Sequence, residues 1–522
     1  MSYKVLIPTA GTGSRLGNTT KYINKALVSI GNKPAISRII DMFPADAEFV
    51  VPIGYKGDLI KEFFSLAYPD RKVFFSVVDP YEGPGSGLGY SILCCEQYLQ
   101  EPFVFCSCDT LVREQIPAPD HNWMAYGERE DLSQYRTLDV INGRVKEILE
   151  KGTGRSTSKP YIGLAGIYDH TAFWKYMHEG DETAVLQGES YGLRELLHDG
   201  TITAYGLTWM DTGVPEELKQ TKEFFHKKND PNILEKANEA IWFIDGNVIK
   251  FSDNTRFISD RVKRGKILDN YVPSINGSSE HMYRYPMAEG EVLSKSITLP
   301  IFEKLLNISR DFWKPAELNP EQKAEFQKNC MGFYKTKTYE RVSLFYKNFN
   351  KSDGTESING IQMPTLREIL DSIDWDWVAC GNAGRFHGDY HFENILYDEK
   401  RDQFVFLDWR QNFGSSLEVG DIYYDLGKLL HGLIVCHELI SLDEYEIEWN
   451  VDSIHFDLRR KWILTECEDF FMKWVSQNGY DEKKVRLMTA LIFLNIAALH
   501  HYPYGLMLYA LGKTMLWEVS EL

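Results

Sequence analysis

The sequence predicts an α/β domain with a mostly parallel, twisted sheet, followed by an α+β domain with a small β-rich lobe and a large helical lobe. Three observations lead to this prediction. The chain has 522 residues, too many for one hydrophobic core, since domains commonly hold about 100–200 residues. Short apolar runs alternate with segments of helical spacing near the N-terminus, which is typical of parallel sheets. This alternation ends after the polar stretch at residues 226–232.

The first domain is expected to be built from βαβ units. Ligands in such sheets bind beyond the carboxyl ends of the strands. Thr9 and Asp109 both fall just past a predicted strand end. Strands are predicted at residues 4–9, 49–53, 73–78 and 102–107, and helices at residues 35–43, 59–66 and 87–98.

The second domain opens with a predicted β-hairpin around the turn Asp245-Gly246-Asn247. A small β-rich lobe before a larger helical lobe is the order found in protein-kinase-like folds. The hairpin strands are residues 241–244 and 248–252, a helix follows at 255–268, strands at 282–287, 291–293 and 403–407, and helices dominate from residue 299 apart from the loop around Asp389. The predicted boundaries are residues 1–225 for the first domain, 226–238 for a linker, 239–294 for the small lobe and 295–522 for the helical lobe.

Composition narrows the class of protein. The chain is 43% hydrophobic and 25% charged, which argues against long disordered regions. A net charge of −18 disfavours nucleic acid and anionic membranes as partners. The eight cysteines form no CxxC-like pairs, so reduced thiols are expected. The N-terminus runs straight into a strand, and the longest apolar run near the C-terminus, residues 491–499, is too short to span a bilayer. We expect a cytoplasmic protein; its oligomeric state stays open.

A glycine-rich turn after the first strand is a candidate phosphate site. Its backbone N–H groups can wrap a polyphosphate, and the cations Arg15 and Lys25 suit a triphosphate. A plain tight turn and solvated surface cations are the alternatives. A second glycine-dense loop is either a flexible connection or a backbone surface for a base or sugar. The nucleotide-binding candidates are Ala10, Gly11, Thr12, Gly13, Ser14, Gly85, Ser86 and Gly87.

Two carboxylates are candidate ligands for Mg²⁺ in the first domain. Asp109 ends a buried strand, and Asp211 lies in a turn before a helix. Mg²⁺ binds one or two carboxylates together with phosphate oxygens. An N-cap role is the alternative for Asp211.

In this order, these segments resemble the nucleotidyltransferase family that makes nucleoside-diphosphate sugars and CDP-alcohols, over residues 1–225. The resemblance implies a Rossmann-like fold in which Arg15 steadies the leaving pyrophosphate and Lys25 neutralises the α-phosphate. Asn24 stands where the family usually has Pro, which weakens the placement of Lys25. The resemblance also implies that Asp109 and Asp211 hold Mg²⁺ and that the substrate meets Glu150, Lys151 and Gly166.

A second constellation lies far downstream. Asn394 follows Asp389 by five residues, and Asp408 ends the next apolar strand. In kinase-like enzymes one Asp accepts the proton of the substrate hydroxyl, while an Asn and a second Asp hold Mg²⁺. The run around Asp389 resembles the choline-kinase and aminoglycoside-phosphotransferase family, over residues 239–522. The resemblance implies these roles for Asp389, Asn394 and Asp408, with Lys250 on the ATP phosphates.

The second constellation leaves several assignments open. No glycine-rich GxGxxG precedes Lys250, and an exposed strand lysine is the alternative there. Tyr390 and Trp409 adjoin the acidic residues and are the candidates for substrate contact, although most aromatics in this lobe are expected to be core. Asp421 and Asp425 are expected to brace the catalytic loop.

Together the motifs predict a bifunctional enzyme. One half would phosphorylate a small alcohol or sugar with ATP and Mg²⁺. The other half would couple that phosphate to a second NTP with Mg²⁺, CTP or GTP being favoured, and release pyrophosphate. The product would be an activated precursor for capsule, lipopolysaccharide or another cell-surface polymer. One alternative is a monofunctional nucleotidyltransferase with a catalytically weak kinase-like binding module; another is two activities on unrelated substrates.

Overall fold

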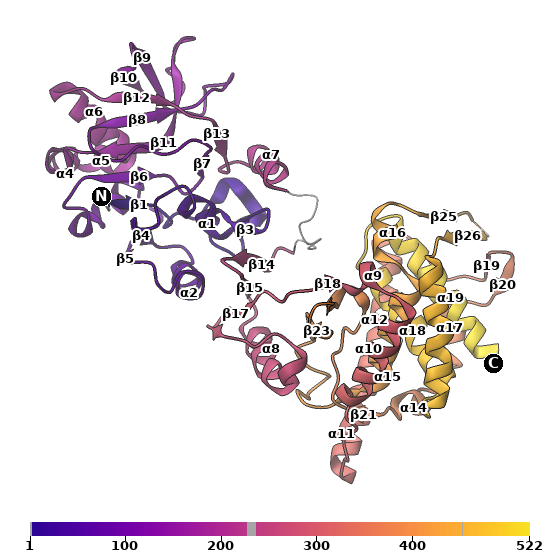
Figure 1. Cartoon of the computed structure of the whole chain (residues 1–522). Coiled ribbons are helices and arrows are strands. Elements are labelled where there is room, and N and C mark those ends of the chain that lie inside the picture. The colour runs from indigo at the N-terminus through magenta and orange to yellow at the C-terminus, as the bar shows by residue number, and fades with distance from the viewer. Residues whose placement is uncertain (1–2, 227–235, 452, 522) are drawn as a thin grey trace. The chain divides into compact units, whose positions relative to one another are not determined.

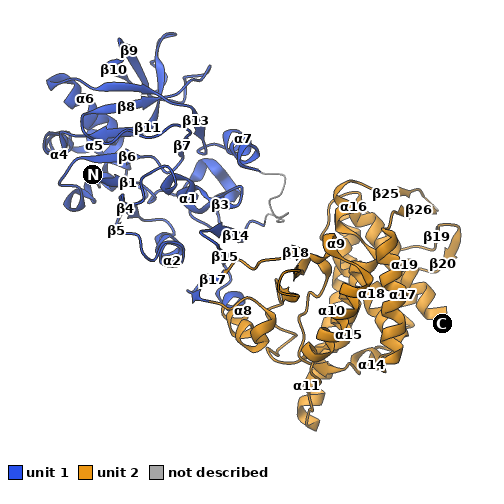
Figure 2. Ribbon diagram, in the orientation of Figure 1, with its two compact units in different colours: residues 1–258, 276–285 blue, residues 259–275, 286–522 orange. Residues whose placement is uncertain are grey.

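A computed structural model describes residues 3–226, 236–451 and 453–521 (Figure 1). The chain forms two compact units, each assembled from two segments (Figure 2). Unit 1 comprises residues 1–258 and 276–285, and unit 2 comprises residues 259–275 and 286–522. Most of the predicted linker, residues 227–235, lies outside the described residues.

Unit 1 is organised around a nine-stranded sheet. The strand order is β5-β4-β1-β6-β11-β8-β12-β10-β9. The first four strands are parallel, with Val5 of β1 opposite Phe49 of β4 and Val104 of β6. Beyond β6 the sheet is mixed. The strands are β1 (Lys4–Leu6), β4 (Glu48–Ile53), β5 (Val73–Val77), β6 (Phe103–Cys106), β8 (Trp123–Tyr126), β9 (Thr137–Ile141), β10 (Arg144–Leu149), β11 (Lys159–Ile167) and β12 (Thr203–Gly206).

Helices cover both faces of this sheet. Because successive strand residues point to opposite faces, Val5 and Ile7 enter one hydrophobic core and Leu6 enters the other. The core with Val5 includes residues of α1 (Ala35–Ile40) and α2 (Gly57–Ala67). The core with Leu6 includes residues of α3 (Leu88–Leu93), α4 (His170–Glu179), α5 (Asp181–Gln187) and α6 (Glu189–Asp199).

Smaller elements complete unit 1 next to the parallel strands. The antiparallel pair β7 and β13 places Thr110 opposite Asp211, and α7 follows. These elements are β7 (Thr110–Val112), β13 (Trp209–Asp211), α7 (Pro215–Phe225), β2 (Ser29–Ile30) and β3 (Lys33–Pro34).

The strands predicted for a kinase-like small lobe form a four-stranded sheet, in the order β14-β15-β17-β16. The predicted hairpin turn is present, with positive φ at Asp245 (47°) and Gly246 (74°). Trp242 is fully buried in the core of unit 1, and its ring centroid lies 5.3 Å from that of Phe63. This packing explains why the sheet belongs to unit 1. The strands are β14 (Glu239–Ile244), β15 (Asn247–Ser252), β16 (Gly277–Ser278) and β17 (Met282–Pro286).

Unit 2 is mainly helical, as predicted. Every residue of α15 is buried, and glycines let neighbouring helices approach closely. A Cβ on Gly427 of α15 would lie 2.9 Å from Met488 Cβ of α18. The helices are α8 (Thr255–Leu268), α9 (Leu293–Ser296), α10 (Leu299–Phe312), α11 (Pro320–Met331), α12 (Lys337–Phe349), α13 (Leu366–Asp371), α14 (Trp375–Ala379), α15 (Ile422–Ile434), α16 (His437–Ser441), α17 (Trp462–Gln477), α18 (Glu482–Ala497) and α19 (Tyr504–Glu521).

Unit 2 also contains strands. The predicted strand at residues 403–407 is β23. It pairs antiparallel with β22, and the turn at residues 399–402 joins the two strands. A four-stranded sheet, β20-β19-β26-β25, was not predicted. The strands are β18 (Glu291–Val292), β19 (Glu356–Ile358), β20 (Ile361–Met363), β21 (Ala383–Gly384), β22 (Ile395–Asp398), β23 (Gln403–Phe406), β24 (Gly420–Asp421), β25 (Tyr445–Trp449) and β26 (Ser453–Leu458).

The structure also bears on the expectations about membrane spans and cysteines. Among the described residues, every helix is too short or too polar to cross a membrane. All eight cysteines are free thiols, as expected.

Candidate active sites

Asp109 and Asp211 converge at the carboxyl edge of the parallel strands. Asp109 follows β6, and the pairing of β13 with β7 brings Asp211 beside it. A Cβ on Gly213 would lie 2.8 Å from Asp109 Oδ2 and 3.0 Å from Asp211 Oδ1, so both carboxylates reach one point. The backbone N–H of Gly213 donates to Asp211 Oδ1 at 2.7 Å. This donor set fits Mg²⁺, whose preferred protein ligands are carboxylate oxygens.

Lys25 completes the centre by forming an ion pair with Asp109. The Ser107 hydroxyl also donates to Asp109, at 2.5 Å. Burial alone would raise the pKa of Asp109, but the Lys25 cation and these hydrogen bonds hold it below its usual value. Burial and the nearby Asp109 charge raise the pKa of Asp211. Lys25 and the Ser107 hydroxyl therefore stabilise the ionised form of Asp109.

Asn24 positions Lys25 rather than weakening its placement. The Asn24 side chain is fully buried and donates to the carbonyls of Thr9 (3.0 Å) and Tyr55 (2.7 Å). Its Oδ1 accepts from the Ala26 N–H at 2.9 Å. The expected weakening of the placement of Lys25 is wrong. Two hydrogen bonds tie Asn24 to the segments of Thr9 and Tyr55, and the third fixes the backbone around Lys25 itself.

The first glycine-rich turn lies next to this centre. Gly13 has a φ of 66°, and a Cβ there would lie 3.0 Å from Lys25 Cβ. The turn leads into a 3-10 helix, Ser14–Thr20, which is interrupted at Gly17. Arg15 is exposed. Desolvation and the charge of Arg15 lower the pKa of Lys151.

The second glycine-rich loop divides into two parts. Gly83 and Gly85 have φ values of 86° and 82° and open space where a Cβ would be. Ser86 bonds back to Gly83 through its backbone N–H and its hydroxyl, which closes the turn. Gly87 instead serves packing, because a Cβ there would lie 2.4 Å from the carbonyl oxygen of Val185.

Glu150 is held by two arginines that sequence reasoning missed. Arg136 Nε lies 3.2 Å from Glu150 Oε2, and Arg194 donates to Oε1 at 2.6 Å. Strand pairing brings Arg136 to Glu150. Arg136 directly precedes β9, and β9 pairs with β10, which ends just before Glu150. The next residue, Lys151, is exposed.

Gly166 does not face the site, contrary to the substrate role expected for it. It is buried in β11, and a Cβ there would lie 2.1 Å from Trp123 Nε1. The glycine of β11 that does adjoin the site is Gly163, with a φ of 68° and a Cβ position 2.8 Å from Ser107 Cβ. Gly166 therefore makes room for the indole of a core tryptophan.

In unit 2 the loop around Asp389 is braced from α15. Asp425 accepts backbone hydrogen bonds from His387 (2.6 Å) and Gly388 (2.7 Å). Trp313 donates to the same carboxylate at 3.0 Å. The supporting role expected for Asp425 is confirmed. The Asp421 carboxylate has its hydrogen bonds elsewhere in the described part of the chain: it accepts from the Asn382 N–H at 2.9 Å and from the Tyr334 hydroxyl at 2.7 Å.

The two carboxylate oxygens of Asp389 have different partners. Lys428 Nζ lies 2.9 Å from Oδ1, and Asn394 Nδ2 donates to Oδ2 at 3.0 Å. Burial opposes ionisation, but Lys428 and His391 hold the pKa of Asp389 well below its usual range. Asp389 is thus an ionised carboxylate held in a fixed orientation, as required of the group that accepts a hydroxyl proton.

Asp408 comes close to this loop through the backbone. The Leu407 N–H donates to the Asn394 carbonyl at 2.7 Å, which joins the end of β23 to the catalytic loop. Asp408 has a φ of 55°, and its side chain is 39% exposed. Arg261 Nη1 lies 3.7 Å from its Oδ1. Because the Asn394 amide nitrogen points to Asp389, its oxygen points away, and Asn394 and Asp408 offer oxygen ligands that fit Mg²⁺.

The two aromatic residues expected to contact substrate lie in the core. Tyr390 is fully buried, and its hydroxyl lies 2.6 Å from that of Ser309. Trp409 is 1% exposed and donates to the carbonyl of Arg261 at 3.0 Å. Their prediction as substrate contacts is therefore wrong: adjacency in sequence did not place these rings at the surface of the site.

Lys250, predicted to meet the ATP phosphates, lies on β15 in unit 1. It is 8% exposed, and its Nζ lies 6.0 Å from the centroid of the Tyr285 ring. Its role stays a prediction.

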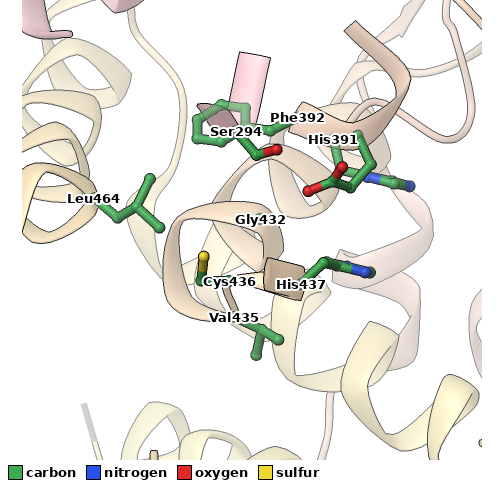
Figure 3. A pocket seen from close by; sticks show the side chains of 9 residues that line it. Ser294, His391, Phe392, Gly432, Val435, Cys436, His437 and Leu464 are labelled. Carbon is green, nitrogen blue, oxygen red and sulfur yellow. The ribbon is translucent and has the colours of Figure 1, made fainter. Parts of the chain in front are cut away.

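A small pocket adjoins the catalytic loop in unit 2 (Figure 3). The rings of His391 and His437 are parallel, with centroids 5.6 Å apart, and His431 lies about as close to both. His391 Nε2 lies 3.2 Å from Asn394 Nδ2, so this ring contacts the catalytic loop. The pocket is lined by Ser294, His391, Phe392, Glu393, Gly432, Val435, Cys436, His437 and Leu464.

Comparison with known proteins separates the two regions. Residues 353–450 match the model of the phosphotransferase enzyme family. The N-terminal region is similar to glucose-1-phosphate cytidylyltransferase of Salmonella typhimurium, with 27% identity over 179 residues that cover 29% of this chain and 70% of that protein. It is also similar to a UTP–glucose-1-phosphate uridylyltransferase of Haemophilus ducreyi, with 22% identity over 39% of this chain and 86% of that protein.

Among solved structures, the chain matches CTP:phosphocholine cytidylyltransferase from Streptococcus pneumoniae with a TM-score of 0.37 and 16% identity, covering 43% of this chain and 100% of that one. The sequence matches confirm the two predicted resemblances. The chain therefore joins a nucleotidyltransferase-like region to a phosphotransferase-family region, the combination of a bifunctional enzyme.

Proposed function

We propose that this chain phosphorylates a small alcohol or sugar with ATP and then couples the resulting phosphate to a second nucleoside triphosphate. The observation that carries the proposal is the presence of two separate carboxylate centres, each with its own cation and loop. Asp109 pairs with Lys25 in unit 1, and Asp389 pairs with Lys428 in unit 2. The product of the kinase reaction is the type of substrate that the transferase reaction consumes.

In the kinase site, Asp389 accepts the proton of the acceptor hydroxyl. The hydroxyl oxygen forms a bond to the γ-phosphorus of ATP, and the bond from that phosphorus to ADP breaks. Asn394 and Asp408 are the residues that would hold Mg²⁺, which supplies charge neutralisation for the phosphates when bound. Asp425 fixes the loop backbone so that the Asp389 carboxylate is already oriented.

In the transferase site, a phosphate oxygen of the acceptor attacks the α-phosphorus of the nucleotide. The bond between that phosphorus and pyrophosphate breaks, so pyrophosphate leaves. Positioning and charge neutralisation dominate such transfers. Lys25 and Arg15 supply positive charge, Asp109 and Asp211 would hold Mg²⁺, and Lys151 meets the acceptor.

The finer parts of the proposal concern nucleotide and pathway. CTP or GTP is favoured as the second nucleotide, and the cytidylyltransferase relative supports CTP. The product would be an activated precursor for capsule, lipopolysaccharide or another cell-surface polymer. Both reactions consume nucleoside triphosphates, which agrees with a cytoplasmic location.

Two carboxamide variants test the division of labour. Asp389→Asn is expected to abolish ADP production and to leave pyrophosphate release intact when a phosphorylated acceptor is supplied. Asp109→Asn is expected to do the reverse. If either variant, shown by circular dichroism to be folded, loses both activities, the two-site proposal is wrong.

A second candidate is a nucleotidyltransferase with a kinase-like module that only binds a ligand. The absence of a glycine-rich GxGxxG before Lys250 favours it. Acceptor-dependent ADP production in the absence of any second nucleotide would exclude this candidate.

A further inference from the structure

Positive charge gathers around the catalytic loop of unit 2. Four cations contribute, and they come from three separate parts of the chain. Lys337 and Arg341 lie one turn apart on α12, so they share a face of that helix. Arg410 follows β23, and Lys428 belongs to α15.

Contacts with the loop and with one aromatic ring hold this basic cluster together. The Arg410 backbone N–H donates to the His387 carbonyl at 2.9 Å, next to the catalytic loop. The Arg410 guanidinium carbon lies 4.6 Å from the centroid of the Phe333 ring. Lys337 Nζ lies 4.3 Å from the same centroid. Lys337 and Arg410 thus meet at Phe333, beside the loop that carries Asp389.

The cluster carries more positive charge than the surrounding carboxylates neutralise. Within the described part of the chain, Lys428 has an ion pair with Asp389, whereas Lys337, Arg341 and Arg410 have no ion pair. The Nε of Arg410 is buried and has no hydrogen-bond partner in that part of the chain. These three cations are half-buried. Cations that are partly removed from water and have no counter-charge are costly, and an anionic ligand would offset this cost.

The partners of Asp389 indicate which of the two substrates, ATP or the acceptor, the basic cluster would bind. Asn394, on the Oδ2 side, belongs to the pair that would hold Mg²⁺ with the ATP phosphates. Lys428, on the Oδ1 side, belongs to the basic cluster. The acceptor hydroxyl must also reach Asp389, because that carboxylate takes its proton. The unneutralised cations are therefore available to the rest of the acceptor molecule.

We propose that the acceptor alcohol of the kinase site carries an anionic group, a carboxylate or a phosphate, that binds Lys337, Arg341 and Arg410. This inference rests on the proposed kinase activity and makes its substrate class specific. A quaternary ammonium acceptor would be repelled by the same cluster. Arginine suits this task because its planar fork can bind carboxylate or phosphate through two parallel hydrogen bonds.

The first experiment compares acceptors that differ mainly in charge. ADP production by the full chain is measured with glycerol (neutral), glycerate (carboxylate), glycerol 3-phosphate (phosphate) and choline (cationic), each with ATP and Mg²⁺. We expect kcat/KM for one of the two anionic acceptors to exceed that for glycerol and choline by about 10-fold or more, as for a charge-assisted contact. The carboxylate and phosphate arms distinguish the two sources of the anion.

The second experiment changes the cations. Lys337→Met and Arg341→Gln are expected to raise KM for the anionic acceptor by about 10- to 100-fold, with KM for ATP unchanged. Lys337→Glu should lower the activity on the anionic acceptor further and improve the relative activity on choline. Lys347→Met is the matched control, because Lys347 is an exposed lysine on the same helix.

The outcomes separate the inference from the proposed function. Preference for choline or glycerol would overturn the inference and leave the kinase proposal standing. A rise in KM for ATP alone in Lys337→Met would assign the cations to the nucleotide and also overturn it. No ADP from any of the four acceptors, in a protein that still releases pyrophosphate, would overturn the inference and favour the module that only binds a ligand. Circular dichroism and thermal unfolding of each variant exclude loss of fold as the cause.

Discussion

Lys428 Nζ lies 2.9 Å from Asp389 Oδ1, so the base of the kinase site is paired with a cation from the most buried helix of unit 2. The contact explains why the pKa of Lys428 is raised although burial alone would lower it. It also fixes the orientation of the Asp389 carboxylate from the side opposite Asn394. The position of α15 is thus coupled directly to the geometry of the catalytic loop.

Replacing Lys428 tests this coupling. Lys428→Met is expected to lower the rate of ADP production by about 10- to 100-fold, because a charge-assisted contact to the base is lost. Lys428→Arg keeps the charge and should lose less. Steady-state ADP release with saturating ATP measures the effect. Pyrophosphate release from a supplied phosphorylated acceptor should stay unchanged in both variants, and equal ADP rates for wild type and Lys428→Met would contradict the assigned role.

Asp425 is predicted to stabilise unit 2 through the catalytic loop. Asp425→Ala leaves the N–H groups of His387 and Gly388 and the Trp313 indole without their shared acceptor. We expect a loss of about 3 kcal/mol in the free energy of unfolding, as for several hydrogen bonds to a buried charged group. Urea unfolding followed by circular dichroism measures it. The exposed Asp457→Ala serves as control, and a loss below about 0.5 kcal/mol would show that the loop is held by other contacts.

Asn24 is predicted to control the transferase site through Lys25. Asn24→Ala removes three hydrogen bonds, and Asn24→Pro keeps a φ near the observed −69° but removes the same bonds. Both variants are expected to lower pyrophosphate release by about 10-fold while ADP production stays unchanged. If Asn24→Pro is fully active, backbone restraint alone positions Lys25.

The charge of Lys337 predicts a pH dependence for acceptor binding. Burial, together with the charges of Arg410, Lys428 and Arg341, lowers the pKa of Lys337 to about 7, while Asp389 acts in the opposite direction. Below this pKa the ammonium is charged and binds an anion; above it the amine is neutral. KM for an anionic acceptor should therefore rise between about pH 6 and pH 8.

A matched variant isolates this titration. Lys337→Arg keeps its charge throughout that range and should flatten the dependence. The pH dependence of KM for ATP should be the same in the wild type and in Lys337→Arg. An acceptor KM that falls as pH rises, or that is unaffected by Lys337→Arg, would contradict the assignment.

Local patterns in the sequence predicted much of both sites. The spacing of Asp389, Asn394 and Asp408 reflects one loop and the strand after it. Asn394 does contact Asp389, and the residue before Asp408 is bonded to the backbone of Asn394. Asp109 was predicted from the end of a buried strand, and its neighbour Asp211 joins it across a short antiparallel pair. The missed sheet in unit 2 had a signal in the sequence, since residues 445–449 alternate between apolar and acidic side chains, which is typical of a half-buried strand.

Other features depend on packing between distant segments. Trp242 enters the core of unit 1, so the predicted small-lobe strands belong there by contact. Tyr390 and Trp409 turn into the core although they directly follow Asp389 and Asp408, because neighbouring residues of an irregular segment can point to opposite sides. Gly166 accommodates Trp123, which is 43 positions earlier in the chain.

The sequence by itself determined the two chemistries, because carboxylates, amides and glycines at fixed local spacing are what phosphoryl and nucleotidyl transfer require. Only the tertiary structure decided the surroundings of each centre. It brought Lys428 to Asp389, tied Asn24 to the segments of Thr9 and Tyr55, and brought Lys337 and Arg410 together at Phe333. Contacts between such charges cannot be predicted from the sequence alone. The interaction energy of two charges depends on their distance in space and on their burial rather than on their separation in sequence.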